Sequence, residues 1–274
     1  MTQDVIDKLN EQCYEMKLKA LDMALGTGAN GSHIGGAFSS MELFAALYEV
    51  ANIADPTAED RDRIIVSKGH CVLSYYTALW KKGFISEDDL DSFDRNGTNF
   101  HGHPHRELEK GMEFSAGSLG LGMSYAVGVA MACKDKKLGN RIFVMLGDGE
   151  CDEGIVWESL MSISNFGLDN VTVIVDRNKY QLDGITDDIM NLFSLEEKFK
   201  AFGFDVQTVD GHDVGAIADA LAKEGEKPAV IIADTIKANG ISFLENNKMS
   251  HHTPLTGKKH AQAVEEIKQA YGKL

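Results

Sequence analysis

The sequence predicts an α/β fold, a doubly wound parallel sheet with helices on both faces. Short apolar runs rich in β-branched residues recur along the chain and alternate with longer segments of helical periodicity. Each run ends, on its carboxyl side, in Gly, His, Asp or Lys. These residues suit a polar ligand, and open parallel sheets bind ligands at the carboxyl edge of their strands.

Five segments are expected to form the strands of this sheet: 64–66, 142–146, 171–175, 206–209 and 230–233. Each is bounded by turn residues, as buried strands of a parallel sheet are. The carboxyl ends of parallel strands lie at one edge. The polar segments that follow these strands are therefore expected to lie together.

Three helices are expected with defined limits. The amino-terminal segment to about Leu25 is amphipathic and charged, and residues 256–274 form a solvated helix with an inward stripe of Val264, Ile267 and Tyr271. Between the second and third strands, residues 155–166 place their apolar side chains on one face, and Gly167 is placed to end the helix.

Composition predicts one soluble domain. The chain has 274 residues, of which 43% are apolar and 25% charged, with four prolines and no Pro/Ser-rich linker. We therefore expect a single domain, 1–274, with helical amino- and carboxy-terminal extensions. The net charge of −15 argues against a nucleic acid or an anionic membrane as partner.

The sequence predicts a cytoplasmic protein. Its four cysteines form no C-x-x-C pair and no disulfide framework, which is typical of a reducing compartment. No signal peptide and no apolar run of membrane-spanning length is found. One of the cysteines, Cys151, could be imagined as a nucleophile, but no thiolate-stabilising motif accompanies it, so we expect a packing role.

The turn after the second strand predicts a cation site. It contains Asp148, and the loop after the third strand contains Asn178 about thirty residues later. A strand–helix–strand unit brings both residues to the same sheet edge. One carboxylate, one amide oxygen and nearby carbonyls form an incomplete oxygen site, which suits Mg²⁺ completed by phosphate oxygens and water.

Two other interpretations of this turn compete with the cation site. An acidic turn followed by an unrelated Asn would explain Gly-Asp-Gly alone, but not its spacing and flanking strands. A nicotinamide-binding loop requires Gly-x-Gly-x-x-Gly, which the glycines at 147, 149 and 154 do not match.

Four short segments carry histidines that could act together. They are Gly31–Gly36, which contains His33; Ser67–His70; Gly102–Pro104, which contains His103; and Ser250–His252. A single loop histidine is more often a surface or packing residue than a catalytic one. None of them shows i, i+4 spacing or a nearby cysteine pair, so zinc is not expected. Histidines suit chemistry that moves protons near neutral pH.

The metal turn with its later Asn closely resembles the thiamine diphosphate motif. The histidine segments, the glycine turn 117–122 and the 210–213 segment Asp-Gly-His-Asp accompany it in the order seen in transketolases. Residues from about 15 to about 255 resemble the amino-terminal, diphosphate-binding third of that family. The resemblance implies the thiamine-diphosphate-binding fold and the cofactors thiamine diphosphate and Mg²⁺.

The resemblance also implies individual roles. The metal ligands would be Asp148, Asn178 and the carbonyl of Tyr180. The channel for cofactor and substrate would be lined by the catalytic histidines His33, His70, His103 and His251, with His103 contacting the first-carbon hydroxyl of a ketose. The cofactor would be contacted by His70, Gly117, Ser118, Leu119, Gly147, Asp148, Gly149, Glu150 and Asn178. Glu153 would lie at a subunit interface, and Asp210 and His212 are interpreted as turn and helix-capping residues.

Family members carry a glutamate, on a second α/β domain, that activates the cofactor. This chain ends before such a domain could begin. We therefore expect one subunit of a split transketolase, which moves a two-carbon ketol unit from a phosphorylated ketose to an aldose. A second subunit would carry the pyrimidine-binding and carboxy-terminal domains, and this chain would also form a homodimer within a heterotetramer.

Two alternatives remain open from the sequence. A subunit of another split thiamine enzyme, of the 2-oxoacid decarboxylase type, would share the metal motif without requiring the histidine set. A non-catalytic regulatory subunit would keep the fold but would be expected to lose the metal ligands.

Overall fold

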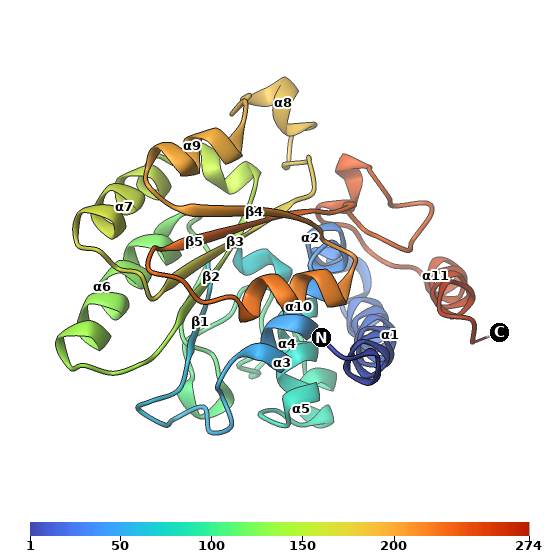
Figure 1. The fold of residues 1–274 in the computed structure, drawn as a ribbon. Coiled ribbons are helices and arrows are strands. Elements are labelled where there is room, and N and C mark those ends of the chain that lie inside the picture. Colours follow the sequence, from blue (N-terminus) through green and yellow to red (C-terminus); the bar gives the residue numbers. More distant parts are fainter. Residues whose placement is uncertain (274) are drawn as a thin grey trace.

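The computed structural model describes residues 1–273 as three layers, with a parallel sheet between two layers of helices (Figure 1). All strand pairings are parallel. The predicted strands are confirmed as β1 (Arg63–Val66), β2 (Ile142–Gly147), β3 (Val171–Arg177), β4 (Asp205–Asp210) and β5 (Ala229–Asp234).

The order of strands in the sheet differs from their order in the chain. The sheet runs β1-β2-β3-β5-β4, so β5 lies beside β3 and β4 forms an edge. The pairing of Thr172 with Ala229 and of Asp205 with Ala229 fixes this arrangement. Strand β4 has no fully buried residue, whereas β2 and β5 are almost wholly buried.

Helices precede, connect and follow the strands. The predicted helices are confirmed as α1 (Gln3–Gly26), α7 (Gly154–Asn165) and α11 (Gly257–Ala270). Gly167, after α7, has a φ of +58°, a conformation that glycine adopts without strain. The other helices are α2 (Ile34–Phe38), α3 (Met41–Val50), α4 (Val72–Lys82), α5 (Glu87–Asp91), α6 (Leu121–Asp135), α8 (Thr186–Ile189), α9 (Leu195–Ala201) and α10 (Val214–Ala222).

The side chains of alternating strand residues pack in two separate hydrophobic cores, one on each face of the sheet. On β2, Phe143 and Met145 pack with α1, α3, α4 and α10, whereas Ile142 and Val144 pack with α6, α7 and α9. The inner strands are apolar on both sides because both faces are covered. This two-sided covering confirms the doubly wound α/β fold.

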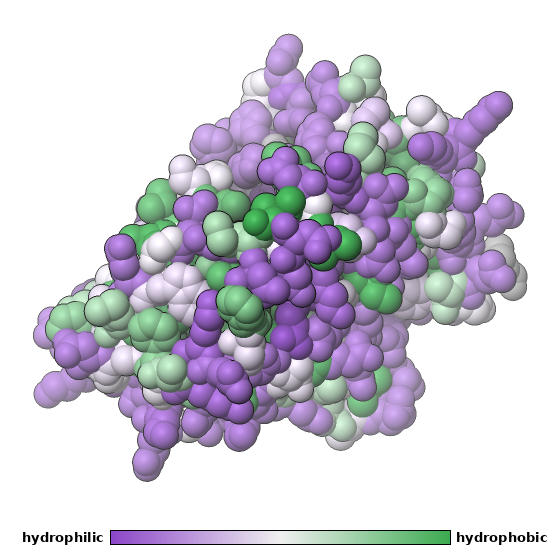
Figure 2. Space-filling model, turned by 90° about the horizontal axis from the view of Figure 1, so that it is seen from above, coloured by the Kyte–Doolittle hydropathy of each residue, from purple (hydrophilic) through white to green (hydrophobic). Residues whose placement is uncertain are grey.

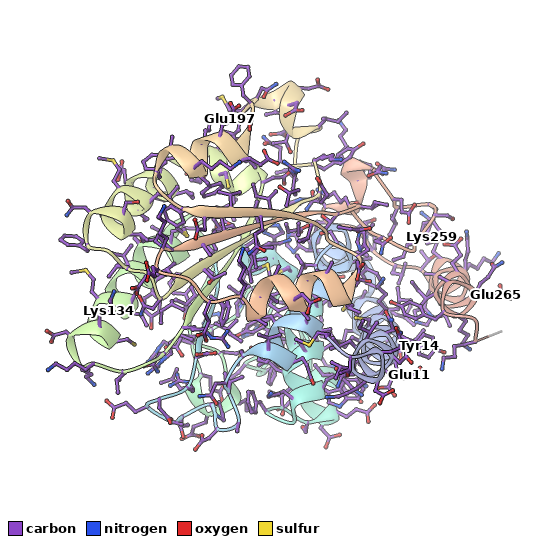
Figure 3. All side chains as sticks on the ribbon, viewed as in Figure 1. Glu11, Tyr14, Lys134, Glu197, Lys259 and Glu265 are labelled. Carbon is purple, nitrogen blue, oxygen red and sulfur yellow. The ribbon has the colours of Figure 1, made fainter. Side chains whose placement is uncertain are left out.

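The two ends of the described chain pack together. Helices α1 and α11 lie side by side (Figure 3). The ring centroids of Tyr14 and Tyr271 are 5.5 Å apart. Ile267 is buried on α11, and Val264 packs against the same core, as the predicted inward stripe requires. The prediction of a single domain with terminal helical extensions stays a prediction.

Many charged side chains, such as those of Lys134, Glu197 and Lys259, lie on the outside of the molecule (Figure 3). Within residues 1–273, no helix combines the length and the apolar character needed to cross a membrane.

Candidate active site

The ends of β2 and β3 bring Asp148 and Asn178 to one loop region, because Gly147 pairs with Asp176 in the sheet. Asp148 Oδ2 accepts a hydrogen bond from the backbone N–H of Lys179 at 2.7 Å. Asn178 Oδ1 accepts one from the N–H of Tyr180 at 3.1 Å. The predicted metal-ligating residues are therefore brought together by one short backbone segment.

The backbone around this segment has an unusual shape. Lys179 has a φ of +66°, in the left-handed region that residues with a side chain rarely occupy. Gly149 approaches the same loop closely: a Cβ there would lie 2.9 Å from Cβ of Gln181. The second glycine of Gly-Asp-Gly is thus required by packing against the 178–181 loop.

The oxygen donors fit a divalent cation. Asp148 is only 4% exposed, and burial together with Asp176 raises the pKa of its carboxyl to about 6. An ionised carboxylate in this position is offset only in part by the nearby Lys68, and a metal ion would supply further positive charge. No group of three His, Cys, Asp or Glu side chains suited to a metal occurs in residues 1–273, so amide and carbonyl oxygens would have to complete the set.

Two buried lysines lie beside this loop. Lys68 forms an ion pair with Asp176 and donates a hydrogen bond to the carbonyl of Gly36 at 3.0 Å. Lys237 Nζ lies 3.4 Å from the carbonyl oxygen of Tyr180. Burial and the neighbouring Lys68 lower the pKa of Lys237 to about 8. These two cations lie among the carboxylates of Asp148 and Asp176 and offset their negative charge.

Neither lysine was among the site residues predicted from the sequence, and nor was Asp176. A signal was present, since Lys68 and Lys237 each follow a strand at the ligand-binding edge. Their mutual proximity depends on the tertiary fold.

The histidine segments converge although they are far apart in the chain. The ring centroid of His33 lies 5.8 Å from that of His70, 5.4 Å from His103 and 5.3 Å from His251. The four predicted catalytic histidines therefore form one cluster. His252 joins them at 4.5 Å from His33, and sequence reasoning did not select it. Its place directly after His251 was the available signal.

The rings of His33, His70, His103 and His251 have lowered pKa values, which favours their neutral form at physiological pH. Burial and the neighbouring histidines lower the pKa of His33 to about 3, and burial and Lys237 lower that of His251 to about 4. Burial and Lys68 also lower the pKa of His70, and burial lowers that of His103. Neutral imidazoles can both donate and accept hydrogen bonds, which suits contact with sugar hydroxyls.

Glycines permit the close approach that forms the cluster. A Cβ on Gly35 would lie 2.6 Å from Oγ of Ser250, and one on Gly69 would lie 2.6 Å from Cβ of Ala116. Ser32 also pairs with Thr253 in an isolated bridge. The segment before α2 is thus attached directly to the segment that carries His251.

Comparison with known proteins identifies the family. Residues 11–273 match the family model for the transketolase thiamine diphosphate binding domain. The chain belongs to the transketolase family. It is 36% identical over 252 residues to an apulose-4-phosphate transketolase subunit from Phocaeicola vulgatus, covering 90% of this chain and 89% of the relative.

Two further transketolases show the same relationship. The 6-deoxy-6-sulfo-D-fructose transketolase subunit of Clostridium is 38% identical over 276 residues, covering 98% of this chain and 99% of the relative. The crystal structure of Campylobacter jejuni transketolase superposes with a TM-score of 0.88 at 30% identity. That match covers 99% of this chain but 43% of the larger enzyme.

Family membership confirms three predictions from the sequence. They are the thiamine-diphosphate-binding α/β fold, thiamine diphosphate as cofactor, and the activity of a transketolase subunit. Mg²⁺ and the roles of individual site residues stay predictions.

In this transketolase subunit, Glu150 connects three backbone segments through hydrogen bonds. Its Oε1 accepts hydrogen bonds from the Ser67 hydroxyl at 2.5 Å and the Gly120 N–H at 2.7 Å. Its Oε2 accepts one from the Gly147 N–H at 3.1 Å. The carboxylate therefore ties the glycine turn and the end of β1 to the metal turn. Contact of Glu150 with the cofactor itself stays a prediction.

Residues 117–119 of the glycine turn lie at the surface, next to the site. Gly117 and Ser118 are exposed and Leu119 is half-buried. A Cβ on Gly117 would meet no protein atom within 4 Å. The turn is fixed at both ends. The Gly120 N–H donates a hydrogen bond to Glu150, and the Ala116 N–H donates one to the Pro104 carbonyl at 3.1 Å. Its predicted contact with the cofactor would occur on this open side.

One expected role in the Asp-Gly-His-Asp segment is wrong. Asp210 does form the turn, since its Oδ1 accepts the N–H of His212 at 2.9 Å. The cap of α10, however, is Asp213, whose Oδ1 accepts the N–H groups of Gly215 at 2.9 Å and Ala216 at 3.0 Å. The half-buried His212 instead contacts Glu42 through its ring.

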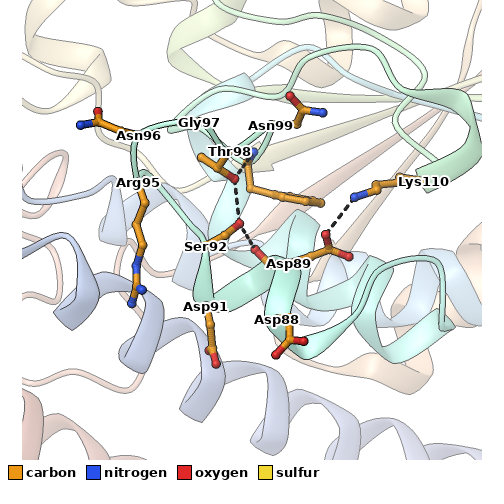
Figure 4. Close-up of a pocket in the computed structure, with 11 residues that line it drawn as sticks. Asp88, Asp89, Asp91, Ser92, Arg95, Asn96, Gly97, Thr98, Asn99 and Lys110 are labelled. Carbon is orange, nitrogen blue, oxygen red and sulfur yellow. Dashed lines mark hydrogen bonds and ion pairs between the residues drawn. The ribbon is translucent and has the colours of Figure 1, made fainter.

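A separate surface pocket of about 460 Å³ lies between α5 and the loop at residues 95–100 (Figure 4). Asp88, Asp89 and Asp91 lie on one side, and Lys110 pairs with Asp89 at 2.8 Å. None of the predicted site residues lines it, so the pocket is distinct from the candidate active site.

Proposed function

We propose that this chain is the diphosphate- and Mg²⁺-binding subunit of a two-chain transketolase. It would transfer a two-carbon ketol unit from a phosphorylated ketose to an aldose. One observation carries the proposal: the Asp148, Asn178 and Tyr180 oxygens and the histidine cluster lie at one sheet edge, linked by Lys237.

Each group would have a distinct task. Asp148, Asn178 and the Tyr180 carbonyl would hold Mg²⁺, and Lys237 would face the diphosphate. Bound thiamine diphosphate would supply the carbon nucleophile for ketol transfer. The neutral histidines would bind the sugar hydroxyls and move protons at them, with His103 at the first-carbon hydroxyl.

The substrate would carry a negative charge at the end distant from its carbonyl group. One relative is named for apulose-4-phosphate and another for 6-deoxy-6-sulfo-D-fructose, so both names specify an anionic group. For this chain we infer a ketose phosphate. Comparing kcat/KM for fructose 6-phosphate and for fructose, in the complete enzyme, tests this inference.

The partner would dock beside the metal loop and bring the pyrimidine-binding and carboxy-terminal domains. The segment that carries α8 exposes an apolar group of side chains, Leu182, Ile185, Ile189, Met190 and Phe193. Figure 2, which views the molecule from the α8 side, shows apolar residues in the middle of a largely hydrophilic face. Both closely similar relatives are named as subunits, which supports a partner chain.

Assembly and location complete the proposal. Two copies of this chain would form a homodimer near Glu153, which is exposed at the start of α7, and with two partner chains would make a heterotetramer. The enzyme would act in the cytoplasm. The four cysteines are all free thiols, which is compatible with a reducing compartment.

The metal assignment can be tested directly. Because Asp148 supplies the only formal negative charge in the set, Asp148→Ala should abolish Mg²⁺-dependent binding of thiamine diphosphate. Asn178→Ala should weaken it, since an amide oxygen contributes less to a hard cation. Calorimetric titration in the presence of the partner measures both. Circular dichroism is the folding control, and unchanged affinity in both variants would exclude this metal site.

A further inference from the structure

A buried polar chain connects the helical layer to the loop that carries Lys237. Lys17 on α1 and Glu42 on α3 are both buried, and Lys17 Nζ lies 2.6 Å from Glu42 Oε1. Glu42 Oε2 lies 3.2 Å from Nδ1 of His212. None of these three residues belongs to the proposed metal, cofactor or substrate contacts.

The hydrogen bonds fix one tautomer of His212. The backbone N–H of Ile236 can only donate, and it lies 2.8 Å from Nε2 of His212. Nε2 must therefore be the unprotonated nitrogen. The ring proton is then on Nδ1, where the carboxylate of Glu42 accepts it. Lys17 and this hydrogen bond, acting against burial, lower the pKa of Glu42 to about 2, so Glu42 is ionised.

The hydrogen bond from Ile236 lies directly before a residue that reaches the site. Lys237 follows Ile236 directly, and its Nζ reaches the carbonyl of Tyr180. The side-chain amide of Asn239, two residues further on, lies 3.0 Å from Nδ1 of the same histidine; because Nδ1 is a donor in this tautomer, the amide must present its oxygen there. The imidazole therefore contacts the loop on both sides of Lys237.

A buried ion pair such as Lys17–Glu42 contributes little net stability, because desolvation of the two charges offsets their attraction. The pair does, however, give His212 a fixed acceptor and thereby a single tautomer. We propose that His212, oriented by Glu42 and Lys17, is a positioning residue that holds the 235–239 loop so that Lys237 reaches the metal loop. The part of this inference that concerns the cofactor rests on the proposed function.

Two substitutions distinguish the roles of the two ring nitrogens of His212, Nδ1 and Nε2. In His212→Gln, the side-chain oxygen can replace Nε2 as the acceptor for the Ile236 N–H. In His212→Asn, the shorter side chain can replace only Nδ1, and the Ile236 N–H loses its partner. Asp213→Ala is the matched control, since it removes the α10 cap at the adjacent residue without touching the loop.

The first measurement is amide hydrogen exchange of the 235–239 loop in the full chain. Loss of one such hydrogen bond should speed exchange of the Ile236 amide about tenfold in His212→Asn. His212→Gln should retain near-normal protection, and Asp213→Ala should not reproduce the selective change. Unchanged protection in His212→Asn, or an equal local change in Asp213→Ala, overturns the proposal.

The second measurement is the affinity for thiamine diphosphate with Mg²⁺, in the complex with the partner subunit. We expect severalfold weaker binding in His212→Asn, with recovery in His212→Gln. A loosened loop with unchanged cofactor affinity would support the positioning role of His212 and would overturn the assignment of Lys237 to the diphosphate. Failure of the positioning role of His212 and failure of the proposed contact between Lys237 and the diphosphate therefore give different results.

Discussion

At the scale of single residues, the protonated form of the Asp148 carboxyl stabilises the metal-free fold, whereas Mg²⁺ binding would require the ionised form. Its pKa is about 6 in the folded chain, whereas about 3.9 is usual for an unfolded Asp. Its proton is thus held more tightly when the chain is folded, and protonation favours the metal-free fold. That contribution is fully present below pH 4 and is lost as pH rises through about 6.

This difference predicts how a variant behaves. Relative to Asp148→Asn, the metal-free wild-type chain should gain free energy of unfolding as pH falls from 7 to 4. The expected gain is on the order of 2 kcal/mol. Denaturant titrations of both chains at several pH values measure it. The histidines, whose pKa values are lowered, act in the opposite direction but cancel in the comparison. A difference that stays constant across this range would contradict the assignment.

His103 provides a second prediction at this scale. If it contacts the ketose hydroxyl and not the cofactor, His103→Ala should lower kcat by about 10²-fold or more, with little change in cofactor affinity. Steady-state kinetics of the two-chain enzyme and cofactor titration separate the effects. His105→Ala, on the same loop with an exposed ring, is the control. Lost cofactor binding with normal residual turnover would show that the role is misassigned.

At the scale of secondary-structure elements, the α8 segment is the least embedded part of the site. Phe193 is 82% exposed and has a φ of +53°, an unfavourable conformation for an aromatic residue. Exposure and backbone strain at one residue are the features expected of a side chain that a partner would bury.

Phe193→Asn tests that interpretation. Asn tolerates the left-handed region, so the isolated chain should keep its stability or gain up to about 1 kcal/mol. Affinity for the partner should fall at least tenfold, because exposed aromatics often dominate interfaces. Thermal unfolding and surface-based binding assays measure the two effects. Phe166→Asn, at the far end of α7, should leave partner affinity unchanged; equal losses in both variants would refute the docking site.

At the scale of the whole molecule, the proposal requires assembly. We expect the isolated chain to form a symmetric dimer without ketol-transfer activity, and the activity to appear when the second chain is mixed in equal amount. Size-exclusion chromatography and a coupled ketol-transfer assay of the mixed chains decide this. Adding Asp148→Ala in place of the wild-type chain is the control. Substantial turnover by this chain alone would refute the split enzyme.

Much of the fold follows from local sequence. Strands such as 142–146 and 171–175 are recognisable because continuous apolar, β-branched runs fit a sheet covered on both faces. Asp148 and Asn178 could be placed together because each directly follows a strand of one strand–helix–strand unit. The right-handed crossover of such a unit leaves little choice of arrangement.

Other features were decided only by tertiary structure. Strand β5 lies between β3 and β4, and β4 forms the edge of the sheet. Local periodicity does not specify which strand forms an edge. His33 meets His251 and His252 because Gly35 allows Ser250 to approach, a contact between segments more than two hundred residues apart. The sequence itself determined which chemical groups this protein carries at its sheet edge. Their pairing, and hence their protonation, depended on long-range packing that no local pattern encodes.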